Sequence, residues 1–454
     1  MKGNLENFID KMQKENLDDI VLKSFSYYFQ KVQKGETGEL SEDSIRPPQS
    51  VNITKYEDLK DKSNKYLKDL VVIKLNGGLG TSMGLKKAKS LLKVKEEKSF
   101  LDIIAQQIIR LREKSGTKIP LMLMDSFNTR KDSLELLSKY EDLKIDDLPL
   151  DFLQNKYPKI VRSDLSPLHK ENDKLNWNPP GHGEIYTAMK ISGTLEKLLN
   201  NGYKYAFISN SDNLGAIVDK QILNYFANLE IPFLMEVCKR TEMDKKGGHL
   251  AETKEGQLIL REVAQCPEED IEEFQNINKY KYFNTNNLWI NLEKLQKKLE
   301  TNNNFLPLPL IVNKKEVEGE KVYQLETAMG AAISIFENSK ALVIPRSRFL
   351  PVKKTNDLLR IWSDAYKINA DKEIVKTSNF TPHIDLDERY YKNIEQLKSH
   401  CKDGIPSLQN CSYLKIIGDV YFGENVVIEG DVTIEAAKKV KIEEKKIKDE
   451  KIKF

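Results

Sequence analysis

Glycine residues are concentrated in the run Lys74–Gly84, which directly follows the apolar stretch Leu70–Ile73. Four glycines lie within the eight residues 77–84, so this segment is nearly bare backbone. The N–H groups of such a loop are open to a phosphate group, because no Cβ keeps the ligand away. The run therefore predicts a phosphate-binding loop at the end of a strand.

Two commoner glycine motifs do not fit the spacing. A Walker A loop needs Gly, four residues and then Gly-Lys-Ser/Thr, and no register of the run supplies it. The dinucleotide fingerprint would need a third glycine where Met83 stands. The remaining alternative is a tight strand-to-helix turn without a ligand. Four lysines follow closely and favour an anion site, since cations and backbone donors would meet there: Lys86, Lys87, Lys89 and Lys93.

A polar run, Ser209–Gly215, follows the short apolar stretch Tyr205–Ile208. Asp212 in this run would lie at the carboxyl end of a buried strand, where magnesium could bridge it to phosphate oxygens. The alternative is an Asx turn or an N-cap of the next helix. A phosphate loop in the same sheet favours the metal hypothesis.

Three further segments carry side chains suited to binding. Trp177–Glu184 holds two prolines, two glycines and a histidine, which gives a rigid entry and a flexible tip, although a lone loop histidine is more often solvated. Phe283–Trp289 clusters amides, which suit sugar hydroxyls or a polar turn before a strand. Arg346–Lys354 is a second cationic cluster, which alone is more often a surface patch.

The elements between these motifs predict an α/β protein with a doubly wound, mostly parallel sheet. A helix over residues 99–114 opens with Ser99 and Asp102 in capping-box spacing. In such sheets ligands bind at the carboxyl ends of the strands, where the glycine loop falls. Short, continuous apolar runs typical of buried strands lie at Leu70–Leu75, Ile119–Met124, Tyr205–Ile208, Pro232–Val237 and Leu288–Ile290.

The two ends of the chain have different patterns. Residues 7–34 place apolar side chains at helical spacing, which predicts an amphipathic helical leader. Ile416–Val420 and Val426–Ile434 repeat glycine and branched apolar residues at short intervals. This pattern fits a short β-helical coil or a pair of hairpin strands equally well.

Composition limits the class of protein. At 454 residues we expect two or three domains, and the net charge of +3 favours no nucleic acid partner. The four cysteines lie far apart and predict neither a zinc site nor a disulfide framework. We expect no signal peptide and no membrane span, and therefore a cytoplasmic location.

Six motifs, in this order, closely resemble those of the eukaryotic-type UTP–glucose-1-phosphate uridylyltransferases, also called UDP-glucose pyrophosphorylases. They are the glycine loop with Lys89-Ser90, Pro179–Gly183, Ser209–Gly215, Phe283–Trp289, Gln324–Ala328 and Arg348–Lys353. One departure is Lys87-Ala88, which stands where the family usually has Gly-Pro.

The resemblance implies three domains. Residues 1–60 would form an N-terminal helical segment, and residues 61–375 a Rossmann-like, GT-A-like nucleotidyltransferase domain. Residues 376–454 would contain a linker and a left-handed parallel β-helix, a unit often used for oligomerisation. Self-association through this domain and a monomer capped by the lysine-rich end are both open.

The resemblance also implies site residues by motif position. Asp212 would bind Mg²⁺, and Lys89 and Lys353 would be catalytic. Glucose 1-phosphate would contact His182, Asn210 and Asn284. UTP would contact Leu75, Asn76, Gly77, Gly78, Lys89, Gln154, Gly181, Asp212 and Lys353.

The implied reaction joins UTP and glucose 1-phosphate to give UDP-glucose and pyrophosphate. A phosphate oxygen of the sugar attacks the α-phosphorus of UTP, so catalysis rests on alignment and charge neutralisation. One alternative is a broader UDP-sugar or UDP-N-acetylhexosamine pyrophosphorylase. A remote one is a non-catalytic sugar-nucleotide sensor or scaffold on the same fold.

Overall fold

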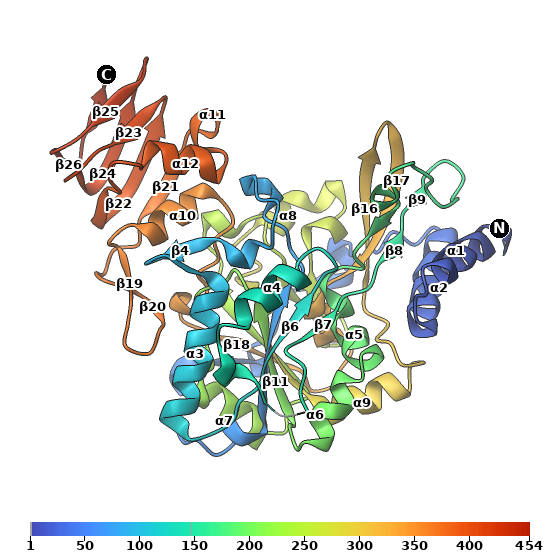
Figure 1. The fold of residues 1–454 in the computed structure, drawn as a ribbon. Coiled ribbons are helices and arrows are strands. Elements are labelled where there is room, and N and C mark those ends of the chain that lie inside the picture. The colour runs from blue at the N-terminus through green and yellow to red at the C-terminus, as the bar shows by residue number, and fades with distance from the viewer. Residues whose placement is uncertain (1, 146) are drawn as a thin grey trace.

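The centre of the molecule is a large sheet, seen in a computed structural model that describes residues 2–145 and 147–454 (Figure 1). Its main path runs β2-β18-β12-β15-β11-β3-β6-β7. Neighbours on this path are parallel, except that β15 is antiparallel to both β12 and β11. The mostly parallel sheet was predicted, whereas the antiparallel strand at its centre was not. The strands are β2 (Ile53–Lys55), β18 (Lys340–Val343), β12 (Phe233–Lys239), β15 (Tyr282–Asn291), β11 (Tyr205–Asn210), β3 (Leu70–Asn76), β6 (Leu121–Asp125) and β7 (Asp151–Leu153).

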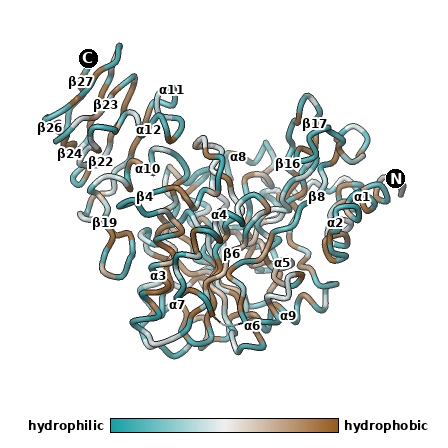
Figure 2. The backbone as a smooth tube through the Cα atoms, in the orientation of Figure 1, coloured by the Kyte–Doolittle hydropathy of each residue, from teal (hydrophilic) through white to brown (hydrophobic). Residues whose placement is uncertain are grey.

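Both faces of this sheet are apolar and are covered by helices. Alternate residues of its strands point to opposite sides and contribute to different cores. Val71 and Ile73 belong to one apolar core, and Val72 between them belongs to another. Figure 2 shows the apolar residues gathered on the central strands and on the helices beside them. The first core is covered by α5 (Ile185–Ile191), α6 (Thr194–Asn200) and α9 (Leu292–Glu300), and the second by α3 (Phe100–Ser115), α4 (Arg130–Leu137) and α7 (Lys220–Asn228).

Helix α3 shows how closely local sequence can fix an element. Ser99 and Asp102 form the predicted capping box, each side chain bonding the other residue's backbone N–H, and Gly116 ends the helix with a left-handed φ of 66°. The helix packs its apolar stripe on the sheet.

Two helices, rather than one leader, precede the sheet. Helices α1 (Lys2–Lys14) and α2 (Asp19–Gln33) are separated by a turn in which Asn16 has a φ of 55°, and Asp18 caps α2. Phe8 of α1 lies between Phe25 and Phe29 of α2, with ring centroids 5.1 and 4.8 Å away. The predicted periodicity was correct, but it did not show where the helix breaks.

A projecting arm is made by a long hairpin, β16 (Leu310–Val317) and β17 (Glu320–Thr327), whose second strand also pairs with β9 (Ile160–Val161). The arm and helices α1 and α2 share one apolar core. Off its main path the large sheet also includes β1 (Ile45–Arg46), β13 (His249–Thr253) and β14 (Leu258–Arg261), with β13 paired to β15. Smaller elements outside it are β4 (Lys93–Lys95), β5 (Lys98–Ser99), β8 (Tyr157–Pro158), β10 (Trp177–Asn178) and α8 (Ile271–Gln275).

The C-terminal part is built of parallel strands. Leu414 pairs with Val432, and Ile434 pairs with Ile452, eighteen residues further on in each case. Its described strand pairs are all parallel, so the alternative of hairpin strands is wrong. The strands are β21 (His383–Leu386), β22 (Ser407–Ile417), β23 (Val420–Phe422), β24 (Val427–Glu435), β25 (Val440–Ile442), β26 (Lys446–Lys448) and β27 (Lys451–Lys453).

One apolar core joins these C-terminal strands to the glycine-loop segment. It contains Met83, Leu92 and Val94 together with Tyr391 and Ile394. Between the two parts lie α10 (Thr355–Trp362), β19 (Tyr366–Ile368), β20 (Ile374–Lys376), α11 (Glu388–Tyr391) and α12 (Ile394–His400). Among the described residues, no helix combines the length and apolar character needed to cross a membrane.

Candidate functional site

The carboxyl ends of three neighbouring parallel strands bring the first predicted site residues together. In the sheet register Asn210 of β11 lies opposite Leu75 of β3, and Asn76 lies opposite Asp125 of β6. The glycine loop begins one residue later, at Gly77. The loop therefore occupies the edge of the sheet at which it was predicted.

The side chains of Leu75 and Asn76 hold the loop from below. Buried Asn76 donates from Nδ2 to Asp125 Oδ1 and Ser133 Oγ, both at 2.7 Å. Burial raises the pKa of Asp125 to about 6, against the opposing effect of the Asn76 hydrogen bond. Leu75 packs on the apolar core, and its carbonyl accepts a hydrogen bond from the Ser211 N–H at 3.1 Å.

Gly78 is the open point of the loop. Apart from its chain neighbours, no described atom lies within 4 Å of the place where a Cβ would stand on Gly78. A Cβ on Gly77 would instead lie 3.1 Å from the Gln154 side-chain oxygen. The Gly78 carbonyl accepts a hydrogen bond from the Lys89 N–H at 3.1 Å, so the chain folds back and Lys89 returns to the loop.

The Lys87-Ala88 departure lies on this returning segment. Ala88 has a φ of −53°, close to the value at which a proline ring fixes the backbone. Ala88 is buried and forms an isolated antiparallel β-bridge with Leu79, whereas the side chain of Lys87 is exposed. The usual proline is therefore replaced by a residue that adopts a similar conformation without it.

Lys89 and Asp212 face each other. The Lys89 ammonium contacts the Asp212 carboxylate, and the two side chains are only 17% and 21% exposed. Lys86 and Lys87 are exposed, and Lys93 forms an ion pair elsewhere on the surface. The expectation that four lysines meet at one anion site is therefore wrong: of the four, only Lys89 reaches Asp212.

Asp212 does not cap the following helix, which was the alternative interpretation. Helix α7 begins at Lys220, and its N-cap is Asp219. The Asx-type turn in this run belongs instead to Asn213, whose Oδ1 accepts a hydrogen bond from the Gly215 N–H at 3.1 Å. The Asp212 carboxylate is therefore left to face Lys89.

Buried Asn213 joins the Asp212 segment to the segment that carries Lys353. Its Oδ1 also accepts a hydrogen bond from the Leu350 N–H at 2.8 Å, and the Val352 N–H donates to the Asp212 carbonyl at 3.1 Å. Lys353 follows directly and is exposed. The structure thus brings the backbone next to Lys353 into contact with the Asp212 segment, although the two are distant in sequence.

The cationic cluster Arg346–Lys354 splits between two environments. Arg348 is buried and donates to both oxygens of buried Glu236, at 2.7 and 2.9 Å. Asn287 and Trp289 complete this carboxylate's bonding, at 3.0 and 2.9 Å. Arg348 therefore supports the segment, and the exposed Lys353 is the cation that the cluster offers to a ligand.

Gln154 and Gly181, both of which the resemblance assigns to UTP, are in contact. Gln154 Nε2 donates to the Gly181 carbonyl at 2.8 Å. Gly181 has a φ of 81°, and a Cβ there would lie 2.4 Å from the Thr327 carbonyl oxygen at the end of β17. Only glycine fits this close approach of the loop to the arm.

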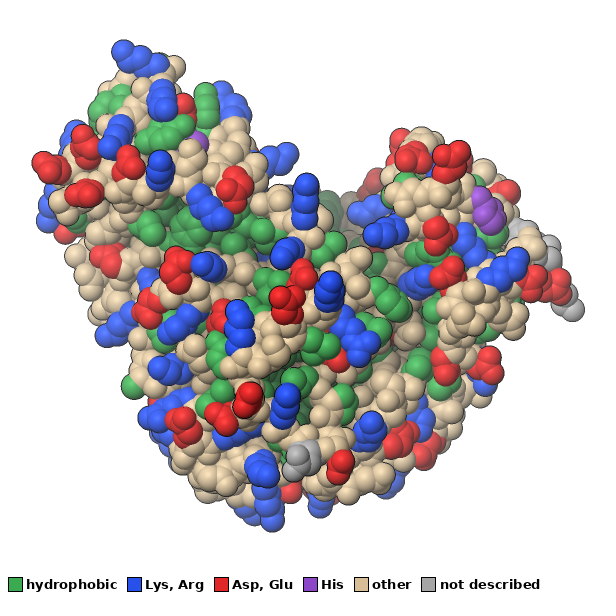
Figure 3. Space-filling view, in the orientation of Figure 1, with side chains coloured by type: hydrophobic (Ala, Val, Ile, Leu, Met, Phe, Trp, Pro, Cys, Tyr) green, Lys and Arg blue, Asp and Glu red, His purple; other side chains and the backbone are tan. Residues whose placement is uncertain are grey.

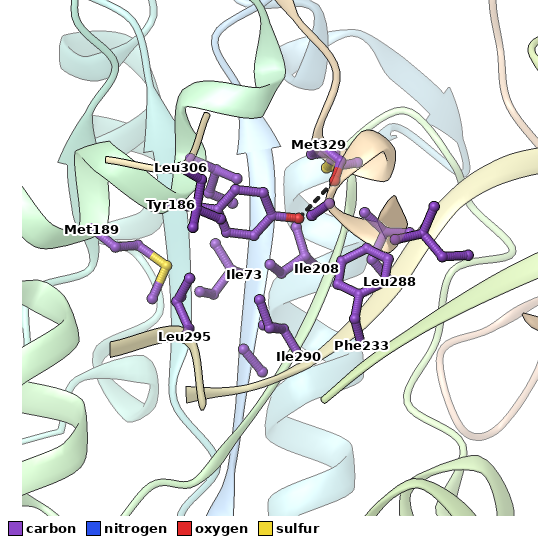
Figure 4. Packing of buried hydrophobic residues seen from close by; sticks show 14 of the residues in the cluster. Ile73, Tyr186, Met189, Ile208, Phe233, Leu288, Ile290, Leu295, Leu306 and Met329 are labelled. Carbon is purple, nitrogen blue, oxygen red and sulfur yellow. Dashed lines mark hydrogen bonds between the residues drawn. The ribbon is translucent and has the colours of Figure 1, made fainter. Parts of the chain in front are cut away.

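His182 is fixed in one protonation state. Its Nδ1 accepts a hydrogen bond from the Met329 N–H at 3.0 Å, and burial lowers the pKa of His182 to about 4. The neutral ring therefore carries its proton on Nε2, which can donate to a ligand. Figure 4 shows that Met329 is also held by Tyr186, whose hydroxyl donates to the Met329 carbonyl at 2.8 Å.

Asn284 lies close to the same segment. A Cβ on Gly330 would lie 2.8 Å from Asn284 Nδ2, which donates to Asn286 Oδ1 at 2.8 Å. Both amides belong to β15, at a register irregularity opposite Glu236, so the alternative of a polar turn before the strand is wrong. Asn210 lies half-buried at the end of β11.

Two acidic residues at the site were not singled out from the sequence. Glu184 accepts hydrogen bonds from Asn155 N and Nδ2, at 2.9 and 2.5 Å, and burial raises its pKa to about 8. Glu262 lies beside Gly248, where a Cβ would come within 2.4 Å of its carboxylate. Burial raises the pKa of Glu262, and the charge of Lys353 opposes that rise.

A local signal existed for one of the two. Glu184 directly follows Gly183 of the proline-histidine loop, whereas Glu262 stands in an ordinary strand end, after Arg261. The Gly248 carbonyl accepts a hydrogen bond from the Asn284 N–H at 3.0 Å, so Glu262 belongs to the Asn284 side of the site.

The acidic side chains at the site suit a metal ion that is bound partly by the phosphates of a substrate. Among the described residues, no group of three or more His, Cys, Asp and Glu side chains could hold an ion alone. Magnesium is commonly held by one or two carboxylates and by substrate phosphates. Asp212, with its carboxylate turned to the loop and Lys89, fits this arrangement.

The whole constellation lies between the C-terminal strands and the arm. A Cβ on Gly84, at the end of the glycine loop, would lie 3.2 Å from Asn393 of the C-terminal part, and Gly181 packs on Thr327 of the arm. Figure 3 shows that the surface is hollowed between these two projections.

The chain is similar to proteins of one family throughout its length. A family model described as UTP–glucose-1-phosphate uridylyltransferase matches residues 22–429. Curated proteins of that name from Musa acuminata and Solanum tuberosum are 42% and 41% identical over 421 residues, covering 90% of this chain and 88% and 87% of theirs.

Solved structures agree with this similarity. The UDP-glucose pyrophosphorylase of Leishmania major has 42% identity and a TM-score of 0.93, with 100% of both chains covered. A variant of that enzyme in complex with UDP-glucose has 42% identity and a TM-score of 0.92, with 99% of both chains covered.

Proposed function

The chain belongs to the UTP–glucose-1-phosphate uridylyltransferase family, and we propose that it transfers the uridylyl group of UTP to glucose 1-phosphate. The products are UDP-glucose and pyrophosphate, and the reaction is reversible. The observation that carries this proposal is the meeting of Lys89, Asp212 and the Lys353 segment at the open glycine loop.

UTP binding is assigned to the loop and to the Gln154–Gly181 pair. Gly77 and Gly78 approach the phosphates through their backbone, since neither has a Cβ to hold the ligand away. The Gln154 amide and the Gly181 backbone read the uracil edge. The two residues are joined by a 2.8 Å hydrogen bond, so they can act on the same ligand edge.

Glucose 1-phosphate is assigned to the opposite side of the site. His182 offers an Nε2–H donor, and Asn210 and Asn284 offer amides to hydroxyl and phosphate oxygens. Glu262 adds an acceptor for sugar hydroxyls, because it lies next to the Gly248–Asn284 contact. Donors and an acceptor are thus combined around a neutral sugar ring.

The chemical step needs alignment and positive charge. The attacking phosphate oxygen is already ionised, so no general base is required. Lys89 and Lys353 offset the negative charge that builds on the leaving pyrophosphate. Mg²⁺ held by Asp212 would supply further charge neutralisation at the phosphates. With Mg²⁺ at Asp212, the Lys89 ammonium would contact phosphate oxygens in place of the carboxylate.

The reaction can be tested directly. The purified chain, incubated with UTP, glucose 1-phosphate and Mg²⁺, should release pyrophosphate. The proposal would be refuted if no divalent metal supported this release. Comparable turnover of galactose, glucose and N-acetylglucosamine 1-phosphates would instead favour the broader pyrophosphorylase. Binding of UDP-glucose without turnover would favour the sensor.

We further propose that the C-terminal strands form a left-handed β-helix. Partners eighteen residues apart support this, because eighteen residues make a coil of three six-residue sides. A crystal structure would give the handedness. Self-association through this part and a cytoplasmic location remain predictions, which light scattering on the full chain and cell fractionation would test.

A further inference from the structure

A second cavity lies on the face of the sheet that α3 and α7 cover, away from the proposed reaction site. It has a volume of about 430 Å³ and is lined by both helices, by β3 and β11 and by the loop before α7. None of the residues assigned above to UTP, sugar or metal lines it. Pockets for small ligands are typically about 300–1,000 Å³, so the cavity is large enough for one.

Lys74 stands at the floor of this cavity. It is 2% exposed, and its Nζ donates to Ser209 Oγ and to the Ala216 carbonyl, both at 2.7 Å. Both acceptors are neutral, and within the described chain Nζ makes no third hydrogen bond. Burial, followed by the charge of Arg348, lowers the pKa of Lys74 to about 7, against the opposing charge of Glu236.

Two of the buried arginines, Arg348 and Arg261, have the anionic partners that Lys74 lacks. Arg348 donates to both oxygens of Glu236, and fully buried Arg261 pairs with Glu42 and Asp270. Removing an ammonium group from water costs more free energy than hydrogen bonds to neutral oxygens restore. A buried ammonium is therefore stabilised by an anion that completes its hydrogen bonding. Lys74 has no such anion: beyond its two hydrogen bonds, its Nζ lies only over the Phe207 ring, 5.4 Å from the ring centroid, within the described residues.

The walls of the cavity indicate the chemistry of a ligand. Five cationic side chains line it against three carboxylates, which leaves an excess of positive charge. The carboxylates already have partners: Asp371 pairs with Lys114, Asp219 accepts from Tyr56, and Glu373 accepts from an asparagine. The exposed Lys62 at the edge makes no hydrogen bond or ion pair within the described residues.

Between these charges the lining is apolar, with Ile104, Ile108 and Leu111 of α3 and Phe207 of β11. We propose that this cavity binds a small organic anion with an apolar body, whose carboxylate or phosphate completes the hydrogen bonding of Lys74. Lys62 at the rim attracts the same anion.

The cavity is connected to the reaction site through one short segment. The two acceptors of Lys74 are Ser209 and Ala216, which flank Asp212 and Asn213 in the chain. An anion would keep Lys74 charged, and a charged ammonium donates stronger hydrogen bonds to these two acceptors. The occupied cavity would therefore order the Asp212 segment and tighten nucleotide binding, a coupling that rests on the proposed function.

Calorimetric titration of the full chain with benzoate and with phenyl phosphate tests the site. Both should bind saturably at one site with UDP-glucose present at saturation, and neutral benzyl alcohol should not bind. Lys62→Glu should weaken binding about tenfold, and Lys74→Met should abolish it. No saturable binding of either anion, or equal binding by benzyl alcohol, overturns the site. If Lys74→Met does not fold, unchanged binding in Lys62→Glu overturns it.

The coupling has a separate measurement. Because linkage is reciprocal, benzoate should bind more tightly with UDP-glucose present than without it. Equal or weaker binding with UDP-glucose overturns the coupling and leaves the site standing. Absence of pyrophosphate release by the wild type would count against the proposed function alone, since the benzoate titration does not depend on turnover.

Discussion

Replacing Asn213 with alanine tests whether the site depends on the joint between its two segments. The side chain accepts hydrogen bonds from the Leu350 and Gly215 N–H groups, at 2.8 and 3.1 Å. It also donates to Asn287 Oδ1 at 3.1 Å and to the Arg348 carbonyl at 3.3 Å. Asn213→Ala removes all four bonds at once and adds no bulk.

The cost follows from the two N–H groups that the substitution leaves buried. An unsatisfied buried donor costs about 1–3 kcal/mol, so the free energy of unfolding should fall by about 2–6 kcal/mol. The segments remain joined by the Val352 N–H bond to the Asp212 carbonyl, so they shift rather than separate. A displacement of about 1 Å at a reacting centre can cost about a hundredfold, and we expect kcat to fall by about 10- to 100-fold.

The assay is pyrophosphate release at saturating substrates, together with denaturant unfolding. A matched control is Asn224→Ala, because Asn224 is also fully buried and donates to the carbonyls of Asp61 and Ser63, away from the reaction site. The control should lose stability and keep kcat. A wild-type kcat in folded Asn213→Ala would refute the claim that activity depends on this link between the two segments. An unchanged free energy of unfolding would refute the assigned cost of the lost hydrogen bonds.

Three further outcomes are expected. Gly181→Ala should lower the free energy of unfolding by about 1–3 kcal/mol and raise the KM for UTP, because residue 181 has a φ of 81° and the added Cβ would meet the Thr327 carbonyl. An unchanged KM, measured where the variant is fully folded, would contradict this. Lys353→Ala should lower kcat by several orders of magnitude without changing the free energy of unfolding. Lys354→Ala removes a neighbouring exposed lysine that pairs with Glu388 and should keep kcat, so equal losses of kcat would remove Lys353 from the mechanism. Folding raises the pKa of Glu184 to about 8, so the stability that its protonated form contributes is full below the usual glutamate pKa and is lost as the pH rises through 8. Glu184→Gln should make the free energy of unfolding depend less on pH between these two values. An unchanged pH dependence would count against the raised pKa.

The parts of the fold that local sequence determines were predictable. Strand β3 and the capping box of α3 depend on residues a few positions apart. The assignment of Gln154 and Gly181 to the same ligand came from the family resemblance, which carries long-range information that spacing alone does not, and their mutual contact came only from the structure. The break between α1 and α2 was missed, because the apolar period continues through residues 15–18 and the turn depends on Asn16 and Asp18.

The parts that depend on distant contacts were not predictable. Glu262 acquires its place only through Gly248 and Lys353, which lie on other elements. The four lysines after the glycine loop looked equivalent in sequence, and only the return of the chain at the Gly78–Lys89 hydrogen bond selects one of them. Arg348 likewise became a buried partner of Glu236 through tertiary pairing.

The apolar core shared by Met83, Leu92 and the C-terminal residues Tyr391 and Ile394 bears on how the protein is made. During translation the glycine loop leaves the ribosome more than 300 residues before Tyr391. Domains generally fold as they emerge, N-terminal parts first. Here the nucleotide loop has to wait for the far end of the chain, so a nascent polypeptide can complete its sheet early while its reaction site matures last.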